Sequence, residues 1–317
     1  MKDRKVVLVG TGFVGMSMAY SFLTSGGIDE LVLIDVNEEK AIGETMDLQH
    51  GLPYARNKLV IKAGGYEECA DAEMVVITAG TAQKPGQTRL DMTAVNTKIM
   101  KGIVENIMAS GFDGILLIAS NPVDLMTYVA QKVSGLPKNR VIGSGTILDT
   151  ARLRYLMSEY LSVSPNNIHA YIMGEHGDSS FIPWTHAYVG CKNLLELLDE
   201  QHRDLQDLNE IYHQVQQAAY EIINRKKSTY YGIGLSLNRL VRAILDDEHA
   251  IVTVSCFQNN EYGHEGLYIG VPALLTRKGV EEIVKLKLNE VDQAKFDASC
   301  HTLTDIIENT ITPIIGK

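Results

Sequence analysis

His176 lies in the segment GEHGD (174–178) and is the residue best suited to exchange protons. The pKa of imidazole lies near neutrality, so both of its protonation states are accessible. A strand-like run, IHAYIM (168–173), precedes this segment, and side chains just beyond the end of a strand commonly face a cleft. At this position a functional His176 and an ordinary core or surface histidine are equal alternatives.

A second group of reactive side chains lies in the helical segment LDTARLR (148–154). Asp149 and Arg152 are three residues apart and share one face of the helix, where they could form an ordinary ion pair worth a few tenths of a kcal/mol. Arg154 lies two residues beyond Arg152, roughly 200° around the helix, and must point elsewhere. The side chains of Arg152 and Arg154 therefore point in different directions from the same helix.

A glycine motif, GTGFVG (10–15), follows the apolar run KVVLVG, and a second apolar run, ELVLIDV, leads to Asp35. This order of strand, glycine turn, helix, strand and acid is typical of a dinucleotide site. Pyrophosphate would approach the helix N-terminus, where N–H groups are unpaired. Asp35 would accept hydrogen bonds from the ribose hydroxyls and disfavour a 2′-phosphate, which predicts NAD as the cofactor.

Alternating elements must position these residues. Short apolar runs alternate with helical segments up to about residue 145, which predicts βαβ units and six parallel strands. From about residue 146, longer helices, including one over 200–224, are mixed with hairpin-like strands, IVTVSCF and GLYIGVPALL. The expected fold is α/β: a Rossmann-type doubly wound parallel sheet in a domain over 1–145, and an α+β catalytic and substrate domain over 146–317.

Composition narrows the functional classes. The formal net charge is −10, without a block of Lys or Arg, which argues against nucleic acid or an anionic membrane as a partner. The four cysteines form no CxxC pair, so neither a metal site nor a disulfide framework is expected. No signal-peptide core and no apolar run of about 18 residues is evident, so a cytoplasmic protein is expected.

Six motifs in succession give the sequence a family resemblance: GTGFVG with Asp35, ITAGTAQKPGQTRLDM, SNPVD, GSGTILDTARLR, GEHGDSS and STYYGIG. In this order they resemble the L-lactate and malate dehydrogenase family over essentially the whole chain, and in particular its bacterial L-lactate dehydrogenases. The resemblance implies reversible hydride transfer between NADH and pyruvate, giving L-lactate, as the last step of lactate fermentation.

The same resemblance implies a role for each matching residue. His176 would be the acid/base, Asp149 its partner in competition with the Arg152 ion pair, and Arg89 a third catalytic residue that polarises the carbonyl as its loop closes. The implied substrate-binding residues are Gln83, Arg89, Asn121, Asp124, Arg152 and Thr229. The implied NAD-binding residues are Gly10, Gly12, Val14, Gly15, Asp35, Lys40, Tyr66, Gly80, Thr81, Ala119, Asn121 and Ser144.

Substrate choice is expected to depend on Gln83. Malate dehydrogenases of the family have an arginine at this position, which pairs with the second carboxylate of oxaloacetate, whereas glutamine is neutral and disfavours burial of that charge. Thr229 matches the small polar residue that closes the pocket in lactate enzymes. Two departures from the family pattern, Gln87 and the segment KKST (226–229), could alter loop closure or the pocket wall.

Arg154 and His169 match residues that bind fructose 1,6-bisphosphate in allosteric bacterial members of the family. The resemblance implies that this effector bridges positive groups of two subunits and favours a homotetramer or its active state. The alternative is an ordinary surface pair.

Three other functions remain open. The same chemistry could act on malate or on a larger branched L-2-hydroxy acid. NAD-dependent glycosidases have a similar sheet, but no CxxH-type motif follows NPVD here. A protein that binds NAD without catalysis would be expected to lack His176, Asp149 or Arg152, and all three are present.

Overall fold

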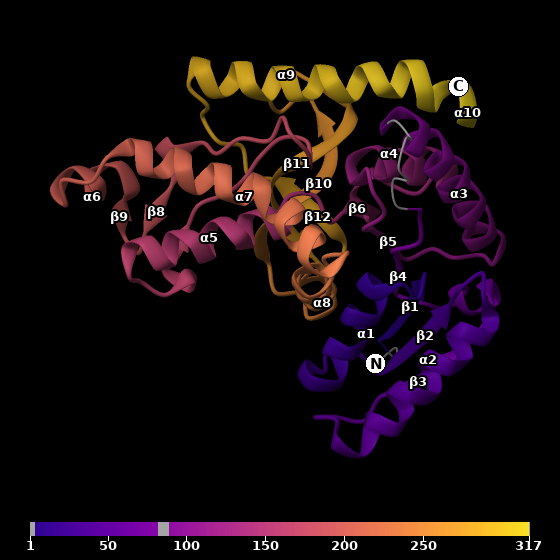
Figure 1. Ribbon diagram of the computed structural model, residues 1–317. Helices are drawn as coiled ribbons and strands as arrows, with labels where there is room; N and C mark the ends of the chain where they lie inside the picture. Colours follow the sequence, from indigo (N-terminus) through magenta and orange to yellow (C-terminus); the bar gives the residue numbers. More distant parts are fainter. Residues whose placement is uncertain (1–3, 82–88, 317) are drawn as a thin grey trace.

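The computed structural model describes residues 4–81 and 89–316, with side chains described throughout except at 89–91. Figure 1 shows the arrangement of its helices and strands. The strands are β1 Lys5–Val9, β2 Glu30–Ile34, β3 Val60–Ala63, β4 Met74–Ile77, β5 Ile115–Ile118, β6 Val141–Gly143, β7 Ile168–His169, β8 Tyr188–Val189, β9 Lys192–Asn193, β10 Ala250–Asn259, β11 Glu265–Thr276 and β12 Gly279–Ile283. The α-helices are α1 Phe13–Ser25, α2 Glu38–Gly51, α3 Arg89–Ala109, α4 Val123–Ser134, α5 Ile147–Leu161, α6 Leu194–Glu200, α7 Leu205–Lys226, α8 Tyr231–Leu245, α9 Glu290–Ile306 and α10 Thr312–Ile315. Short 3₁₀ turns cover Leu52–Tyr54, Tyr66–Cys69, Lys138–Arg140, Pro165–Asn167 and Trp184–His186, and a π-helical turn covers Ile307–Ile311.

The first six strands form the parallel part of a nine-stranded sheet in the order β3-β2-β1-β4-β5-β6. The side chains of β1, β4, β5 and β6 are buried on both faces, which explains why each reads as a continuous apolar run, whereas β3 at the edge of the sheet is partly exposed. The strand order reverses between β1 and β4, and ligands of such sheets bind at this point, beside the carboxyl ends of the strands. The predicted Rossmann-type sheet is confirmed.

The C-terminal half adds to the same sheet. Strands β10 and β11 form the expected antiparallel hairpin, β12 pairs with β11, and β10 joins β6 through the pair Ser255 and Gly143. The sheet therefore continues across the boundary expected at residue 145, and the division into two domains stays a prediction. Helix α9 (yellow in Figure 1) lies over β11, and its continuation reaches α3.

One predicted helix begins later than expected. The sequence predicts a single helix over 200–224, but α6 ends at Glu200 and α7 begins at Leu205. The break has a local cause, because the Asp204 carboxylate accepts a hydrogen bond from the Gln206 N–H, 2.8 Å away, and thereby caps α7. Leu205 is consequently exposed at the first turn rather than part of the buried stripe of Leu208, Ile211 and Val215. The run IHAYIM is likewise a strand only at Ile168–His169.

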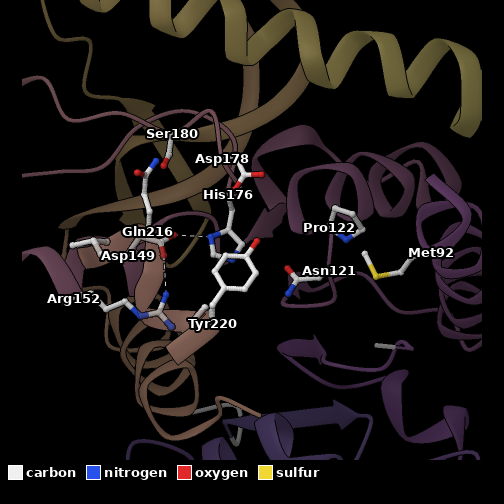
Figure 2. Close-up of a pocket in the computed structure, with 13 residues that line it drawn as sticks. Met92, Asn121, Pro122, Asp149, Arg152, His176, Asp178, Ser180, Gln216 and Tyr220 are labelled. Atoms are coloured by element: carbon white, nitrogen blue, oxygen red, sulfur yellow. Dashed lines mark hydrogen bonds and ion pairs between the residues drawn. The ribbon is translucent and has the colours of Figure 1, made fainter. Parts of the chain in front are cut away.

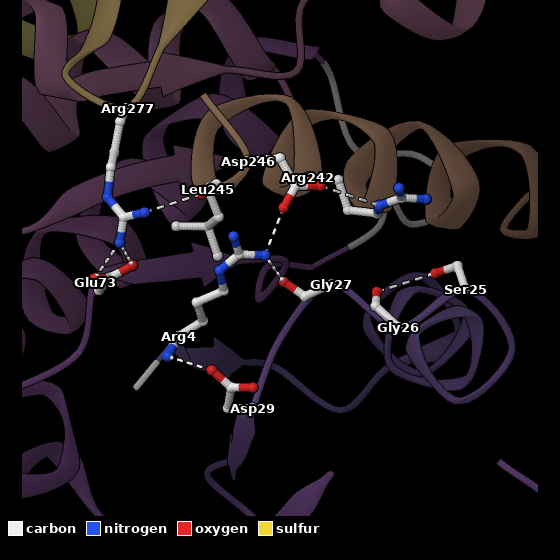
Figure 3. Close-up of polar contacts among 10 residues, drawn as sticks. All are labelled: Arg4, Ser25, Gly26, Gly27, Asp29, Glu73, Arg242, Leu245, Asp246 and Arg277. Carbon is white, nitrogen blue, oxygen red and sulfur yellow. Dashed lines mark hydrogen bonds and ion pairs between the residues drawn. The ribbon is translucent and has the colours of Figure 1, made fainter. Parts of the chain in front are cut away.

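Helix α8 connects the two halves of the chain by packing against α1. A Cβ at Gly234 would lie 2.5 Å from the Cβ of Ser17, so only glycine allows this approach. Figure 3 shows the polar contacts at the end of α8, where Arg4 donates to Asp246 and Nη2 of Arg277 donates to both carboxylate oxygens of Glu73, at 2.6 and 2.8 Å. The first strand is thus attached to a helix more than 200 residues away in sequence.

No helix within residues 4–81 and 89–316 combines the length and apolar character required to cross a membrane.

Candidate active site

The imidazole of His176 contacts the carboxylate of Asp149. Nδ1 of His176 lies 2.6 Å from Oδ2 of Asp149, in the first turn of α5, and the ring belongs to the loop that follows Gly174. Because Nδ1 is engaged, Nε2 is the ring nitrogen left to exchange a proton.

Asp149 also binds Arg152, one helical turn further along α5. Nη1 of Arg152 donates to Oδ1 of Asp149 over 3.0 Å. The expected competition between the histidine and the arginine is therefore wrong, because the two partners take different oxygens of one carboxylate. Figure 2 shows both contacts together.

These charges set the protonation states of the pair. The negative charge of Asp149 raises the pKa of His176 to about 9, against the opposing effect of burial. Burial opposes ionisation of Asp149, but the charges and hydrogen bonds of His176 and Arg152 outweigh it and hold the pKa of this carboxyl below its ordinary value. At neutral pH the imidazolium of His176, the carboxylate of Asp149 and the guanidinium of Arg152 together carry one net positive charge.

A cavity of about 310 Å³ opens in front of this group. Five segments contribute to it: α5, the loop after Gly174, α7, the start of α3 and the turn after β5 (Figure 2). Its lining residues are Met92, Asn121, Pro122, Asp149, Arg152, His176, Gly177, Asp178, Ser180, Val215, Gln216, Ala219 and Tyr220. A small organic anion would meet a proton donor and a bidentate cation on one side and apolar groups on the other.

The glycine turn between β1 and α1 has the shape of a phosphate cradle. A Cβ on Gly15 would lie 2.3 Å from the carbonyl oxygen of Gly10, so glycine is required for close packing there. A Cβ on Gly12 would meet no atom within 4 Å, and no side chain caps α1. Unpaired N–H groups therefore face open space, which fits a dinucleotide pyrophosphate.

Asp35 and Lys40 hold this turn. Oδ2 of Asp35 accepts from both the N–H and the hydroxyl of Thr11, at 2.7 and 2.8 Å, and Oδ1 accepts from the N–H of Asn37 at 3.0 Å. Burial opposes the ionised form of Asp35, but these bonds lower its pKa. Lys40 donates to the carbonyl oxygen of Thr11. The anionic Asp35 retains lone pairs for ribose hydroxyls, which fits NAD.

The remaining predicted cofactor residues follow the same edge of the sheet. Val14 lies in the first turn of α1, and the others lie beyond the carboxyl ends of β3, β4, β5 and β6: Tyr66, Gly80 and Thr81, Ala119 and Asn121, and Ser144. A buried residue missed from the sequence, Asn96 of α3, connects two of these ends. Its amide accepts from the Thr81 N–H at 2.9 Å and donates to the Asn121 carbonyl oxygen at 2.8 Å.

Comparison with known proteins agrees with this geometry. Residues 4–143 match the family model for the lactate/malate dehydrogenase NAD binding domain, and residues 146–312 match that for the lactate/malate dehydrogenase alpha/beta C-terminal domain. The chain belongs to the lactate/malate dehydrogenase family.

Several relatives of this family member are similar over nearly their whole length. L-lactate dehydrogenase 2 and L-lactate dehydrogenase 1 of Bacillus cereus (strain ATCC 10987 / NRS 248) are 53% and 52% identical to it, over 98% of each chain. A lactate dehydrogenase from a Medee basin deep-sea metagenome library superimposes with a TM-score of 0.96 at 51% identity, covering 98% of this chain and 99% of that chain. Minor L-lactate dehydrogenase from Enterococcus mundtii, in its ligands-bound form, superimposes with a TM-score of 0.95 at 48% identity, covering 97% of this chain and 98% of that chain.

Asp124, at the start of α4, is 2% exposed and is not among the described residues that line the cavity. One oxygen accepts from the His176 N–H at 2.8 Å and the other from the hydroxyl of Ser255. Burial raises the pKa of Asp124 to about 6 although these bonds oppose the rise. These contacts fix the backbone of His176, and the substrate-binding role implied by the family resemblance stays a prediction.

Other residues expected from the family lie outside the cavity as described. Gln83 and Gln87 lie outside the described residues, and Arg89 begins α3 with its side chain outside them. Thr229 lies between α7 and α8, away from the described lining residues. Arg154 turns away from the cavity, as its helix position indicates, and its Nε donates to the carbonyl oxygen of Ala170 at 3.1 Å, next to the exposed His169.

One wall of the cavity of this family member was missed from the sequence. Val215, Gln216, Ala219 and Tyr220 of α7 all line it. Their spacing of one and four residues places them on one helical face. The polar Gln216 and the bulky Tyr220 within that face were the available signal.

Proposed function

We propose that this chain is an NAD-dependent L-lactate dehydrogenase that reduces pyruvate reversibly to L-lactate. The observation that carries the proposal is the contact of Asp149 with both His176 and Arg152 at the wall of one cavity. A proton donor and a carboxylate clamp are the two groups that reduction of a 2-oxo acid requires. The similarity to L-lactate dehydrogenases over nearly the whole chain supports the same assignment.

His176 supplies the proton. NADH, when bound in the cradle at Gly12, supplies the hydride for the carbonyl carbon. His176 donates from Nε2 to the carbonyl oxygen, so that one hydride and one proton convert the ketone to an alcohol. Asp149 stabilises the imidazolium before transfer and holds the ring in place afterwards, and the same contacts serve the reverse reaction.

Arg152 and the neighbouring segments hold the substrate. The guanidinium of Arg152 binds the substrate carboxylate in bidentate fashion, a geometry that lysine cannot provide. Asn121 lies on the opposite side of the cavity and donates to the reacting oxygen (Figure 2). Arg89, at the start of α3, polarises the same oxygen with its positive charge.

Gln83 selects a monocarboxylate, with Thr229 completing the pocket. A neutral glutamine provides no partner for the second carboxylate of oxaloacetate, so burying that charge is unfavourable by several kcal/mol. The alternatives are turnover of malate or of larger branched 2-hydroxy acids. Steady-state rates on pyruvate, oxaloacetate and 2-oxoisocaproate test the assignment. Pyruvate is expected to give the highest kcat/KM, and faster turnover of oxaloacetate would contradict the role of Gln83.

Fructose 1,6-bisphosphate is the proposed effector, bound by Arg154 and His169 between two subunits of a homotetramer. The two residues lie close together, because Arg154 donates a hydrogen bond to the carbonyl oxygen of Ala170, the residue after His169. The exposed apolar side chains of Phe13, Tyr20, Tyr231 and Leu235, between α1 and α8, also favour a subunit contact. Sedimentation and pyruvate kinetics at pH 5.5 to 7.5 test this proposal; an unchanged apparent affinity at millimolar effector would contradict regulation.

We place this activity in the cytoplasm, as the step that regenerates NAD at the end of glycolysis. All four cysteines are free thiols, which suits a reducing compartment.

A further inference from the structure

Three side chains near His176 form a closed ring of hydrogen bonds. The backbone N–H of Glu175 donates to Oγ of Ser299 at 2.7 Å, and the hydroxyl of Ser179 donates to Oε2 of Glu175 at 2.7 Å. Since the Ser179 hydrogen is committed to the carboxylate, the 3.0 Å contact between Ser179 and Ser299 must use the hydrogen of Ser299. Each donor in the ring therefore has an acceptor, and the direction of every bond is fixed.

Ser299 reaches this loop from a distant part of the chain. It lies in α9, is fully buried, and is 124 residues from Glu175 in sequence. The approach depends on Gly174, which has φ +99° and whose added Cβ would lie 3.0 Å from Oγ of Ser299. A larger residue at Gly174 would push α9 and the loop apart.

The ring holds the residue immediately before His176. The N–H of His176 is held by Asp124, its ring by Asp149, and the preceding peptide by Ser299. Gly174, at the start of the loop, exchanges two backbone hydrogen bonds with Gly270 of β11, at 2.9 and 3.0 Å. Removing Ser299 would leave a buried N–H without a partner and free the peptide on one side of the histidine.

We propose that Ser299 is a positioning residue for His176, acting through the N–H of Glu175 and the hydroxyl of Ser179. Ser299 touches neither substrate nor cofactor. It keeps the imidazole at the distance from Asp149 that maintains its charge and its direction of proton transfer. This inference rests on the proposed acid/base function of His176.

The test is Ser299→Ala, assayed for pyruvate reduction across pH 5 to 10. We expect kcat to fall about tenfold with KM for pyruvate within about twofold, because displacement of a catalytic group affects the chemical step more than binding. The alkaline limb of the kcat profile is expected to move to lower pH by about one unit, as a longer His176–Asp149 contact stabilises the imidazolium less.

Cys300→Ala is the matched control. Cys300 is the next residue of α9, is equally buried, and loses one heavy atom in the same way, but takes part in none of the three hydrogen bonds of the ring. It is expected to lower thermal stability without moving the alkaline limb. A Ser299→Ala profile equal to that of Cys300→Ala would overturn the proposal.

Ser179→Ala provides a second variant if Ser299→Ala does not fold. Ser179 is partly exposed, and its loss opens the ring while leaving the Glu175 to Ser299 bond in place, so a smaller shift in the same direction is expected. If Ser299→Ala does not fold, an unmoved alkaline limb of the kcat profile and an unchanged kcat in Ser179→Ala would overturn the proposal.

His176→Asn separates the proposed acid/base function of His176 from the positioning role of Ser299. Retained activity in His176→Asn would contradict the proposed function. Loss of activity in His176→Asn, together with wild-type kinetics for Ser299→Ala, would contradict only the positioning role.

Discussion

The carboxylate of Asp149 is shared between two partners, one on each oxygen. His176 takes Oδ2 and Arg152 takes Oδ1, so the same anion charges the proton donor and orients the substrate clamp. An i, i+3 pair on an exposed helix contributes little, but here both side chains are 14% exposed and line a cavity. At the scale of single residues, Asp149 links the two functions of the site.

Asp149→Asn is expected to shift the pH dependence of pyruvate reduction. Reduction requires protonated His176, and the anion raises its pKa to about 9, so activity stays constant through neutral pH and falls above about 9. Without the anion the pKa returns towards about 6.5 and the fall begins there. The measurement is kcat against pH. If kcat of the variant still falls only near pH 9, Asp149 does not raise the pKa of the histidine.

Gln83 and Arg89 are expected to have separable roles. Gln83→Arg should raise the kcat/KM ratio of oxaloacetate to pyruvate at least about tenfold, because the new charge pairs with the second carboxylate. Arg89→Gln should slow all 2-oxo acids alike, because the polarising cation is lost. The measurement is kcat/KM of both variants on a panel of 2-oxo acids. Equal losses of activity in the two variants would show that Gln83 and Arg89 do not have separate roles.

Several site residues could be predicted because their signal is local. The glycine turn, Asp35 and the Asp149–Arg152 spacing are all contained in short segments. Ser299 and Asn96 could not be predicted in this way, because each bonds a backbone group that only the folded chain brings near. The contacts of Asp124 with the His176 N–H and the Ser255 hydroxyl could not be predicted for the same reason, since these partners lie 52 and 131 residues away.

At the scale of elements, two glycines at the N-terminus of α1 are expected to serve different purposes, Gly12 in cofactor binding and Gly15 in stability. Gly12→Val should leave the melting temperature nearly unchanged, because an added Cβ meets no atom within 4 Å. The same change should weaken NADH binding at least about tenfold, because the side chain fills the space that the phosphates would occupy. Gly15→Ala should lower the melting temperature, since its Cβ would lie 2.3 Å from the Gly10 carbonyl oxygen. Fluorescence titration and thermal melts test the pair, and normal NADH affinity in Gly12→Val would contradict the cradle.

An ion-pair network ties β1 and β3 together through Lys5, at the end of β1 opposite to that cradle. Oε2 of Glu68 binds Nζ of Lys5 at 2.8 Å and Nζ of Lys62 at 2.9 Å, and Lys5 is buried at the start of β1. The Lys5 contact is the main cause of the lowered pKa of Glu68.

Glu68→Gln is expected to destabilise the protein by about 1–3 kcal/mol at neutral pH, because buried Lys5 loses an anionic partner. The stabilisation from a depressed carboxyl pKa is present above the unfolded value, about 4.5, and is lost as pH falls through the folded pKa. Urea denaturation at pH 7 and pH 3.5 should therefore show a difference between wild type and variant that shrinks in acid. A constant difference would exclude the charge as its source.

At the scale of the whole molecule, one sheet carries both halves of the chain. The six parallel strands were predictable from apolar runs and helical spacing, whereas the attachment of β10 to β6 was not, because it depends on one pair of distant residues, Ser255 and Gly143. That attachment places the His176 loop, which bonds β11 and α9, opposite the carboxyl ends of the NAD-binding strands. The active site is therefore a product of both halves.

The most direct test is a stopped-assay comparison of wild type and His176→Asn with NADH and pyruvate, including the chirality of the product. Wild type is predicted to form one L-lactate for each NADH oxidised. His176→Asn is predicted to bind NADH normally and to turn over about 10²–10⁴-fold more slowly, the range that a positioned acid/base contributes. Absence of L-lactate with wild type, or near-normal turnover by the variant, would contradict this account.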